Sequence, residues 1–207
     1  MSMPMNPSAF KTSRWEAMKA YNRADAIWIY TPQPEKQILP QAMKPLAHPD
    51  TFYLQAARGW FELGNLEEAR AEVNFIRARQ REHPDVMELL WQIAARLQEW
   101  ERCAELGEKI IRAVPRQVQG YIHKAFALHE LGRTQEAWDL LFPMAERFPH
   151  DVTIKYNLAC YAAQLARLWE AEQWLKLAFT LGKEDELRAQ ALADPDLKPI
   201  WAKIMDL

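Results

Sequence analysis

Few side chains in this sequence have the type and spacing that catalysis or metal binding requires. His123 and His129 lie six residues apart, whereas two metal ligands on one helix face lie four apart. The acidic runs at 67–68 and 184–186 stand near expected helix starts, where carboxylates favour the helix dipole. No glycine-rich phosphate loop, HExxH, GxSxG or paired CxxC occurs. The sequence therefore predicts no enzyme, no metal site and no cofactor.

The tripeptide His-Pro-Asp occurs twice, at 48–50 and 83–85, and a scrambled echo, Pro-His-Asp, occupies 149–151. A single copy is a working motif in the J-domain of co-chaperones that engage Hsp70, but there a basic helix precedes it. No such helix precedes either copy here. Proline ends a helix because it lacks an amide donor, and an aspartate beside it can cap the next helix. We therefore interpret both tripeptides as boundaries between repeated units.

The composition is that of a globular protein with little net charge. The chain has 207 residues, 49% of them hydrophobic, and 26 basic residues against 28 acidic ones. A phosphate-backbone binder normally carries a basic stripe, so we do not expect nucleic acid as a partner. The opening residues lack an apolar run of signal-peptide length, and no run of about 18 apolar residues occurs. We expect a cytoplasmic protein without membrane insertion, whose Cys103 and Cys160 are small buried groups.

The chain is expected to be mostly helical and to repeat. Only six glycines occur, and helix-forming residues fill the segments between them; the one strand candidate is AIWIY at 26–30. A small residue directly follows a Glu or Cys in each expected second helix. It is found at Ala69, Ala104, Ala137 and Ala171, so the successive intervals are 35, 33 and 34.

A period of about 34 residues, made of two helices and a tight turn, resembles the tetratricopeptide repeat. The first and third repeats carry the family's small, aromatic, glycine, alanine and proline residues at Ala57, Trp60, Gly64 and Ala69, and at Tyr121, Ala125, Gly132, Ala137 and Pro149. In the second and fourth repeats Glu99 and Ala166 replace the turn glycine, and Gln92 replaces a small residue.

The resemblance implies an all-α fold, a right-handed α-α superhelical solenoid of about four helical hairpins with N- and C-terminal capping helices. We expect the repeats at 50–84, 85–117, 118–150 and 151–182. Residues 1–12 are expected to be disordered. Residues 13–49 should hold a helix from about 14 to 28 and a proline-rich connection, and 183–207 should form two short capping helices.

In this family the first helices of successive repeats line a concave groove through positions 2, 5, 9 and 12. On this alignment those positions are Thr51, Leu54, Arg58 and Phe61; Val86, Leu89, Ile93 and Arg96; Gln119, Ile122, Phe126 and His129; and Thr153, Tyr156, Cys160 and Ala163. The basic residues and Asn that bind the carboxylate end of Hsp70 or Hsp90 in some members are not present.

The predicted groove is instead an apolar stripe of Leu54, Phe61, Leu89, Ile93, Ile122, Phe126 and Tyr156, edged by Arg58, Arg96 and His129. An exposed stripe of this size usually marks a binding site. We therefore expect a protein partner that presents an apolar or amphipathic segment.

Two alternatives remain open at this point. If the alignment is shifted by one residue, some groove positions belong to the core between helices. The amphipathic stretch at 14–30 offers the second alternative, because it could fill the groove, cap the first repeat, or swap into a second chain and form a homodimer.

Overall fold

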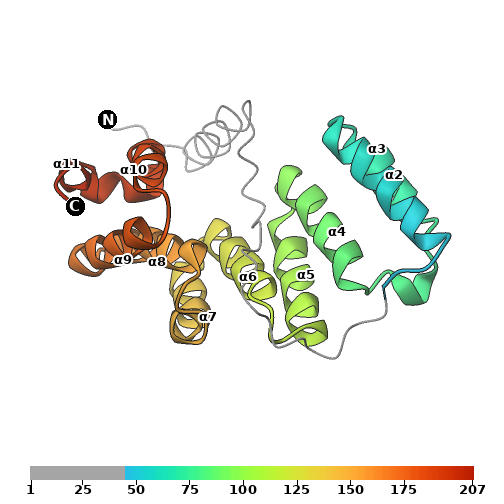
Figure 1. Cartoon of the computed structure of the whole chain (residues 1–207), viewed down its shortest axis with the longest axis horizontal. Helices are drawn as coiled ribbons and strands as arrows, with labels where there is room; N and C mark the ends of the chain where they lie inside the picture. The colour runs from blue at the N-terminus through green and yellow to red at the C-terminus, as the bar shows by residue number, and fades with distance from the viewer. Residues whose placement is uncertain (1–44) are drawn as a thin grey trace, which may run out of the picture.

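A computed structural model of the protein describes residues 45–207, and every regular element in this range is helical (Figure 1). Four hairpins follow one another: α2 (Asp50–Glu62) with α3 (Leu66–Val73), α4 (Pro84–Arg96) with α5 (Trp100–Ala113), α6 (Gln119–Glu130) with α7 (Thr134–Arg147), and α8 (Val152–Gln164) with α9 (Leu168–Leu181). A short 3-10 helix, η1 (Ala78–Gln80), follows α3. The tail consists of α10 (Glu184–Ala193), the 3-10 helix η2 (Pro195–Ile200) and α11 (Trp201–Ile204). The expected helix at 14–28, like the expected disorder at 1–12, lies outside the described residues.

The turns inside the four hairpins recur at a constant interval along the chain. Each contains one residue with a left-handed backbone: Gly64 (φ 81°), Gln98 (φ 57°), Gly132 (φ 78°) and Ala166 (φ 60°). Glycine adopts this conformation without steric penalty, whereas an L side chain costs about 1–2 kcal/mol there. The packing of paired helices therefore requires this turn even where no glycine is present.

We expect Gln98→Gly to raise the free energy of unfolding by about 1 kcal/mol, because glycine removes the strain of the left-handed turn. Urea denaturation followed by circular dichroism measures this change. The matched control is Leu97→Gly, one residue earlier, where φ is −88° and glycine should destabilise the protein. A lower stability of Gln98→Gly would contradict the prediction.

The second repeat is displaced by one residue from the predicted alignment. Cys103 is fully buried, whereas Ala104 is half-buried. With Cys103 in place of Ala104, the buried small residues Ala69, Cys103, Ala137 and Ala171 are evenly spaced. The left-handed turn then falls on Gln98 and not on Glu99, and Trp91, not Gln92, stands where the other repeats have a small residue. The prediction followed the alanine and was wrong by one position in this repeat.

Helices α5 and α6 approach each other most closely at two glycines. A Cβ atom on Gly107 would lie 2.7 Å from the backbone nitrogen of Lys124. A Cβ atom on Gly120 would lie 2.7 Å from the backbone nitrogen of Ile111. Because the nearest atom in each place belongs to the backbone, no larger residue fits without moving a helix.

The helix starts at the His-Pro-Asp tripeptides differ from the predicted aspartate caps. Asp50 is fully buried, and its carboxylate accepts hydrogen bonds from the Arg77 backbone (3.0 Å) and Nε (2.8 Å). At the second tripeptide the cap is His83, whose Nδ1 accepts the Asp85 backbone N–H at 3.3 Å. In the scrambled echo, Asp151 does cap its helix, by accepting the backbone N–H three residues later at 2.9 Å. The first tripeptide therefore anchors the end of its own repeat, through Arg77.

The first helices of the hairpins lie on the inner side of the curved stack. First helices of neighbouring repeats lie close together, α2 near α4 and α6 near α8. The second helices of neighbouring repeats lie farther apart. Helices α3, α5, α7 and α9 are consequently on the outer side. The inner face is therefore where a groove is expected in this fold.

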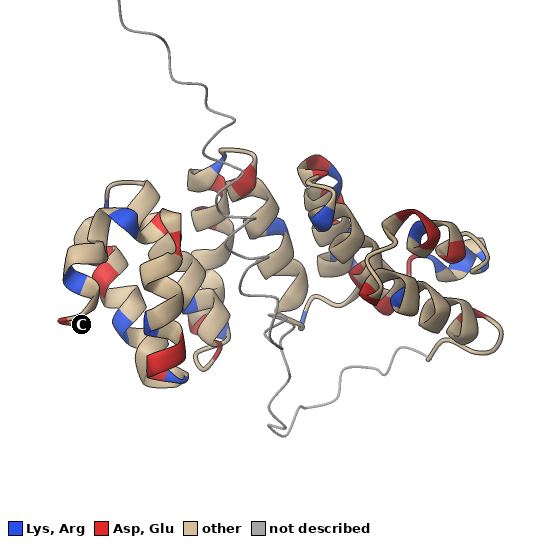
Figure 2. Cartoon of the chain, turned by 90° about the horizontal axis from the view of Figure 1, so that it is seen from above, with Lys and Arg blue, Asp and Glu red and all other residues tan. Residues whose placement is uncertain are grey.

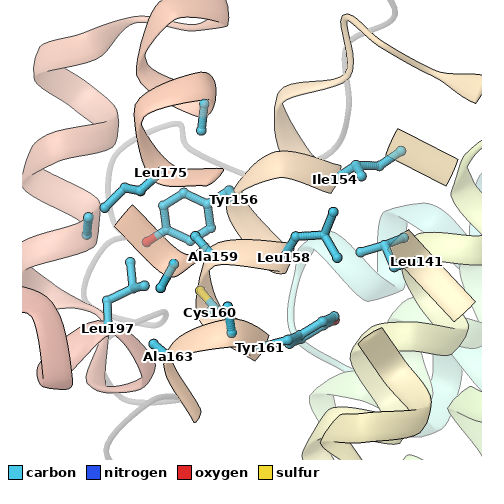
Figure 3. Packing of buried hydrophobic residues seen from close by; sticks show 14 of the residues in the cluster. Leu141, Ile154, Tyr156, Leu158, Ala159, Cys160, Tyr161, Ala163, Leu175 and Leu197 are labelled. Atoms are coloured by element: carbon cyan, nitrogen blue, oxygen red, sulfur yellow. The ribbon is translucent and has the colours of Figure 1, made fainter. Parts of the chain in front are cut away.

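Helix α8 is the most deeply buried helix of the described part. All ten residues from 154 to 163 are buried. Figure 3 shows Leu175 and Leu197 packed on one side of α8 and Leu141 on the other. Because α9 and the tail cover the side that faces away from α7, the C-terminal end of the stack is closed.

Candidate functional site

The candidate site is the inner face, and the corrected alignment changes its membership in the second repeat. The groove positions become Asp85, Glu88, Gln92 and Ala95 in place of Val86, Leu89, Ile93 and Arg96. Leu89 and Ile93 are 1% and 0% exposed and belong to the core shared with the first repeat. Their assignment to an exposed groove was wrong, since the one-residue shift moves them to the side of α4 that packs on the preceding hairpin.

Of Leu54, Arg58 and Phe61, which the first repeat was predicted to place in the groove, one is accessible to solvent. Leu54 and Phe61 are buried in the core with α4, whereas Arg58 is exposed. Arg96 lies with its guanidinium 3.9 Å from the centre of the Phe61 ring and donates to the Phe61 carbonyl at 3.0 Å. Arg96 therefore seals the first repeat against the second and does not edge an open stripe.

The centre of the inner face holds a hydrogen bond between Glu88 and His123 beside a stacked aromatic pair. Glu88 Oε2 lies 2.7 Å from His123 Nε2, and Gln92 donates to the other Glu88 oxygen at 3.1 Å. The His123 ring stacks on Trp91 with 3.9 Å between ring centres. Burial alone would raise the pKa of Glu88, but His123, together with Gln92 and Arg58, holds that pKa below its usual value. Glu88 is therefore a carboxylate at neutral pH.

Two predicted groove residues of the third repeat remain partly exposed. Ile122 and Phe126 are both half-buried on α6. The Phe126 ring contacts Trp91 and Trp100, with ring centres 6.2 Å and 5.8 Å away. An aromatic side chain held by two others is a rigid contact that loses little conformational entropy on binding.

The tail covers the part of the inner face formed by the fourth repeat. The Tyr156 hydroxyl donates to Asp194 Oδ2 at 3.1 Å, and Gln164 Nε2 donates to the Asp196 carbonyl at 2.7 Å. His129 Nε2 lies 3.0 Å from Asp196 Oδ2. The predicted groove residues Tyr156 and His129 are therefore contacts of the chain's own C-terminal segment. Sequence reasoning assigned this segment only to the end of the stack, although Asp194 and Asp196 were a signal for polar contacts.

Metal-ligand types come together at the same place. Within the described residues, Cys160, Asp194 and Asp196 bring their donor atoms within 4.8 Å of one another. Asp194 already accepts hydrogen bonds from Tyr156, from Cys160 at 3.6 Å and from the Asp196 backbone at 3.0 Å. These hydrogen bonds explain why the three residues lie together, since they attach the tail to α8.

The thiol of the other cysteine, Cys103, is unreactive. Burial, with a smaller contribution from Glu99 and against the effect of Arg102, raises the pKa of the Cys103 thiol to about 12. A thiol with this pKa is protonated at neutral pH and is a poor nucleophile. Cys103 is therefore a packing residue, as its place among the small residues of the repeat also indicates.

Charged side chains of both signs are mixed over the described helices (Figure 2). Many of them are paired, such as Arg70 with Glu99 at 2.7 Å and Lys124 with Glu108 at 2.6 Å. A mixed surface of this kind offers no long stripe of one sign to steer a highly charged ligand. Between residues 45 and 207, no helix combines the length and apolar character needed to cross a membrane.

Several solved structures resemble this chain. TTC0263, a thermophilic TPR protein in Thermus thermophilus, is 19% identical, and the match covers 76% of this chain and 100% of that one with a TM-score of 0.59. MamA AMB-1 is 20% identical, with 76% of this chain and 91% of that one covered and a TM-score of 0.55. MamA MSR-1 is 19% identical, with 67% and 76% covered and a TM-score of 0.53. No protein-family model and no curated protein matches the chain. The chain thus has the tetratricopeptide-repeat fold, and the predicted all-α solenoid is confirmed.

Proposed function

We propose that this chain is a protein-interaction scaffold without catalytic activity, which binds an amphipathic segment of a partner protein on the inner face of its first three repeats. The observation that carries the proposal is the group of half-buried apolar side chains, Ile122 and Phe126, beside the exposed Arg58 and the ionised Glu88. A segment with one apolar face and both kinds of charge complements such a surface. A purely apolar ligand would remove water from the charged Glu88 and Arg58 without offering either of them a polar contact.

The covered fourth repeat supports the same mode of binding. There the inner face holds the turn at Asp194–Asp196 through hydroxyl, amide and imidazole groups of Tyr156, Gln164 and His129. The remaining inner face, from Arg58 to Phe126, offers side chains of the same mixed character. The fold's inner face is thus suited to hold a polypeptide, and the first three repeats are where a partner has access.

Peptides selected on the wild-type protein from a random 16-residue display library test this proposal. We expect Arg58→Glu, and separately Phe126→Ala, to weaken binding of the selected peptides about tenfold or more, because each removes a central contact. Fluorescence polarisation with labelled peptides measures the affinity, and far-ultraviolet circular dichroism verifies that the helices persist.

The matched control is Trp169→Ala, which removes an aromatic side chain that is 71% exposed on α9, away from the inner face. Its affinity should equal that of the wild type. If the control loses binding while both inner-face variants keep it, the site is on the outer side and the proposal fails.

A further inference from the structure

The two ends of the stack differ in whether their apolar side chains are covered. At the C-terminal end, Leu197 and Ile204 of the tail are each 0% exposed. At the N-terminal end, Phe52 on α2 is 58% exposed and Phe75 after α3 is 63% exposed. An apolar face is therefore covered at one end and open at the other.

The constant interval between repeats shows what this open face corresponds to. The positions equivalent to Phe52 in the later repeats are Val86, Gly120 and Ile154, and all three are buried. Val86 and Ile154 are 0% exposed, and Val86 belongs to the core that the second repeat shares with the first. In each later repeat this side of the first helix thus packs against a preceding hairpin. The first repeat has the same side but no described element against it.

The open face is a continuous aromatic surface. The Phe52 ring meets Tyr53 edge-on at 5.7 Å between ring centres. Tyr53 in turn stacks on Phe75 at 5.5 Å, which joins α2 to the segment after α3. Large contiguous apolar patches are seldom left bare on a soluble protein. We call these three residues the N-terminal edge.

We propose that residues 14–30 of this chain dock on the N-terminal edge as an amphipathic helix. The described chain begins at residue 45, only five residues before α2, the helix that carries Phe52. Trp15, Met18 and Tyr21 recur at helical spacing and give the segment an apolar face. A helix of residues 14–28 is about 22 Å long, close to the roughly 20 Å of α2. The 14 residues from 31 to 44 reach at most about 50 Å, which is enough to bring the helix back along α2.

A second copy of the chain is the weaker candidate for the same surface. At the C-terminal end Leu197 and Ile204 are buried, so head-to-tail stacking could offer the N-terminal edge only the exposed side chains of the tail, such as Met205. The attached segment has an effective concentration in the millimolar range, well above that of a second chain in solution. This docking contact shares no residue with the inner-face site. A negative result for one proposal therefore leaves the other unaffected.

Disulfide cross-linking in the full chain tests this contact. Met18→Cys is combined with Gln55→Cys, an exposed position on α2 one turn from Phe52, while the two native cysteines are buried. The comparison pair is Met18→Cys with Trp169→Cys, since Trp169 is 71% exposed on the distant α9. We expect a cross-link within one chain that forms at least about tenfold faster in the Gln55 pair than in the Trp169 pair.

Replacing Phe52 and Phe75 by Ser in the Gln55 pair should slow the cross-link about tenfold, because the docking surface loses two anchors. Both side chains are exposed, so the described helices should keep their circular dichroism signal. Equal rates in the two pairs, or a rate that the Ser changes leave unaltered, would overturn the proposal. A cross-link between two chains, seen as a doubled mass, would overturn it in favour of a dimer.

Discussion

Gly107→Ala is expected to lower the free energy of unfolding by about 3 kcal/mol, because overpacking a close helix contact forces backbone to move. The new methyl group would lie 2.7 Å from the nitrogen, 2.8 Å from Cβ and 2.9 Å from Cα of Lys124. None of these atoms can turn aside, since two belong to the backbone of α6 and Cβ is bonded directly to it. The added helix propensity of alanine offsets only about 1 kcal/mol. Urea denaturation with the linear extrapolation measures the difference.

Gly59→Ala makes the same chemical change in an open place. Gly59 lies inside α2, and an added Cβ would have no atom within 4 Å. We expect this variant to be more stable than the wild type by about 0.5–1 kcal/mol, because alanine favours the helix. If both glycines respond alike, the close contact between α5 and α6 is not what limits the size of residue 107.

Asp50→Asn is expected to lower the melting temperature at neutral pH by about 5 °C or more, because it removes the charge of a buried carboxylate that is paired with the partly exposed Arg77. Asp50 is fully buried, and one of its carboxylate oxygens lies 2.6 Å from a terminal nitrogen of Arg77. The matched control is Asp85→Asn, the same residue of the second tripeptide, whose side chain is 61% exposed. The control should melt within about 1 °C of the wild type, as exposed charges contribute little.

The Asp50 effect should depend on pH in a defined direction. Hydrogen bonds from the Arg77 side chain and backbone hold the pKa of Asp50 below its usual value in the folded protein. A carboxyl group with a lowered folded pKa stabilises the fold fully above its unfolded pKa of about 3.9, and this contribution is lost as the pH falls through the folded value. The difference in melting temperature between wild type and Asp50→Asn should therefore shrink from pH 7 to pH 3. A constant difference would show that shape rather than charge is responsible.

The fold was predictable because its determinants repeat. Ala69, Ala137 and Ala171 mark places where two helices touch, and Gly64 and Gly132 mark turns with a left-handed backbone. Steric requirements of this kind appear directly in residue size, so the sequence indicates them. In the second repeat cysteine and glutamine meet the same requirements, and no simple pattern distinguishes Cys103 from the neighbouring Ala104.

The inner face was predicted less well, for two physical reasons. A helix turns by about 100° per residue, so the one-residue error moved Leu89 and Ile93 from the core to the predicted groove. The second reason is tertiary: the contacts of Tyr156 and His129 with the tail join residues 38 and 67 positions apart. Periodicity contains no information on contacts of this kind. Arg58, Ile122 and Phe126 keep their predicted groove positions, and their role in binding remains a prediction.

The attachment of the tail to α8 also limits how this architecture can be lengthened. Helix α10 lies against α9, and η2 is held to α8 by Asp194 and Asp196. A duplicated unit spliced in behind α9 would have to displace all of these contacts at once. A unit spliced in at the boundary before α6, for example, would leave them untouched. Longer or shorter versions of such a protein should therefore vary upstream, while the last hairpin and the tail are inherited as a single block.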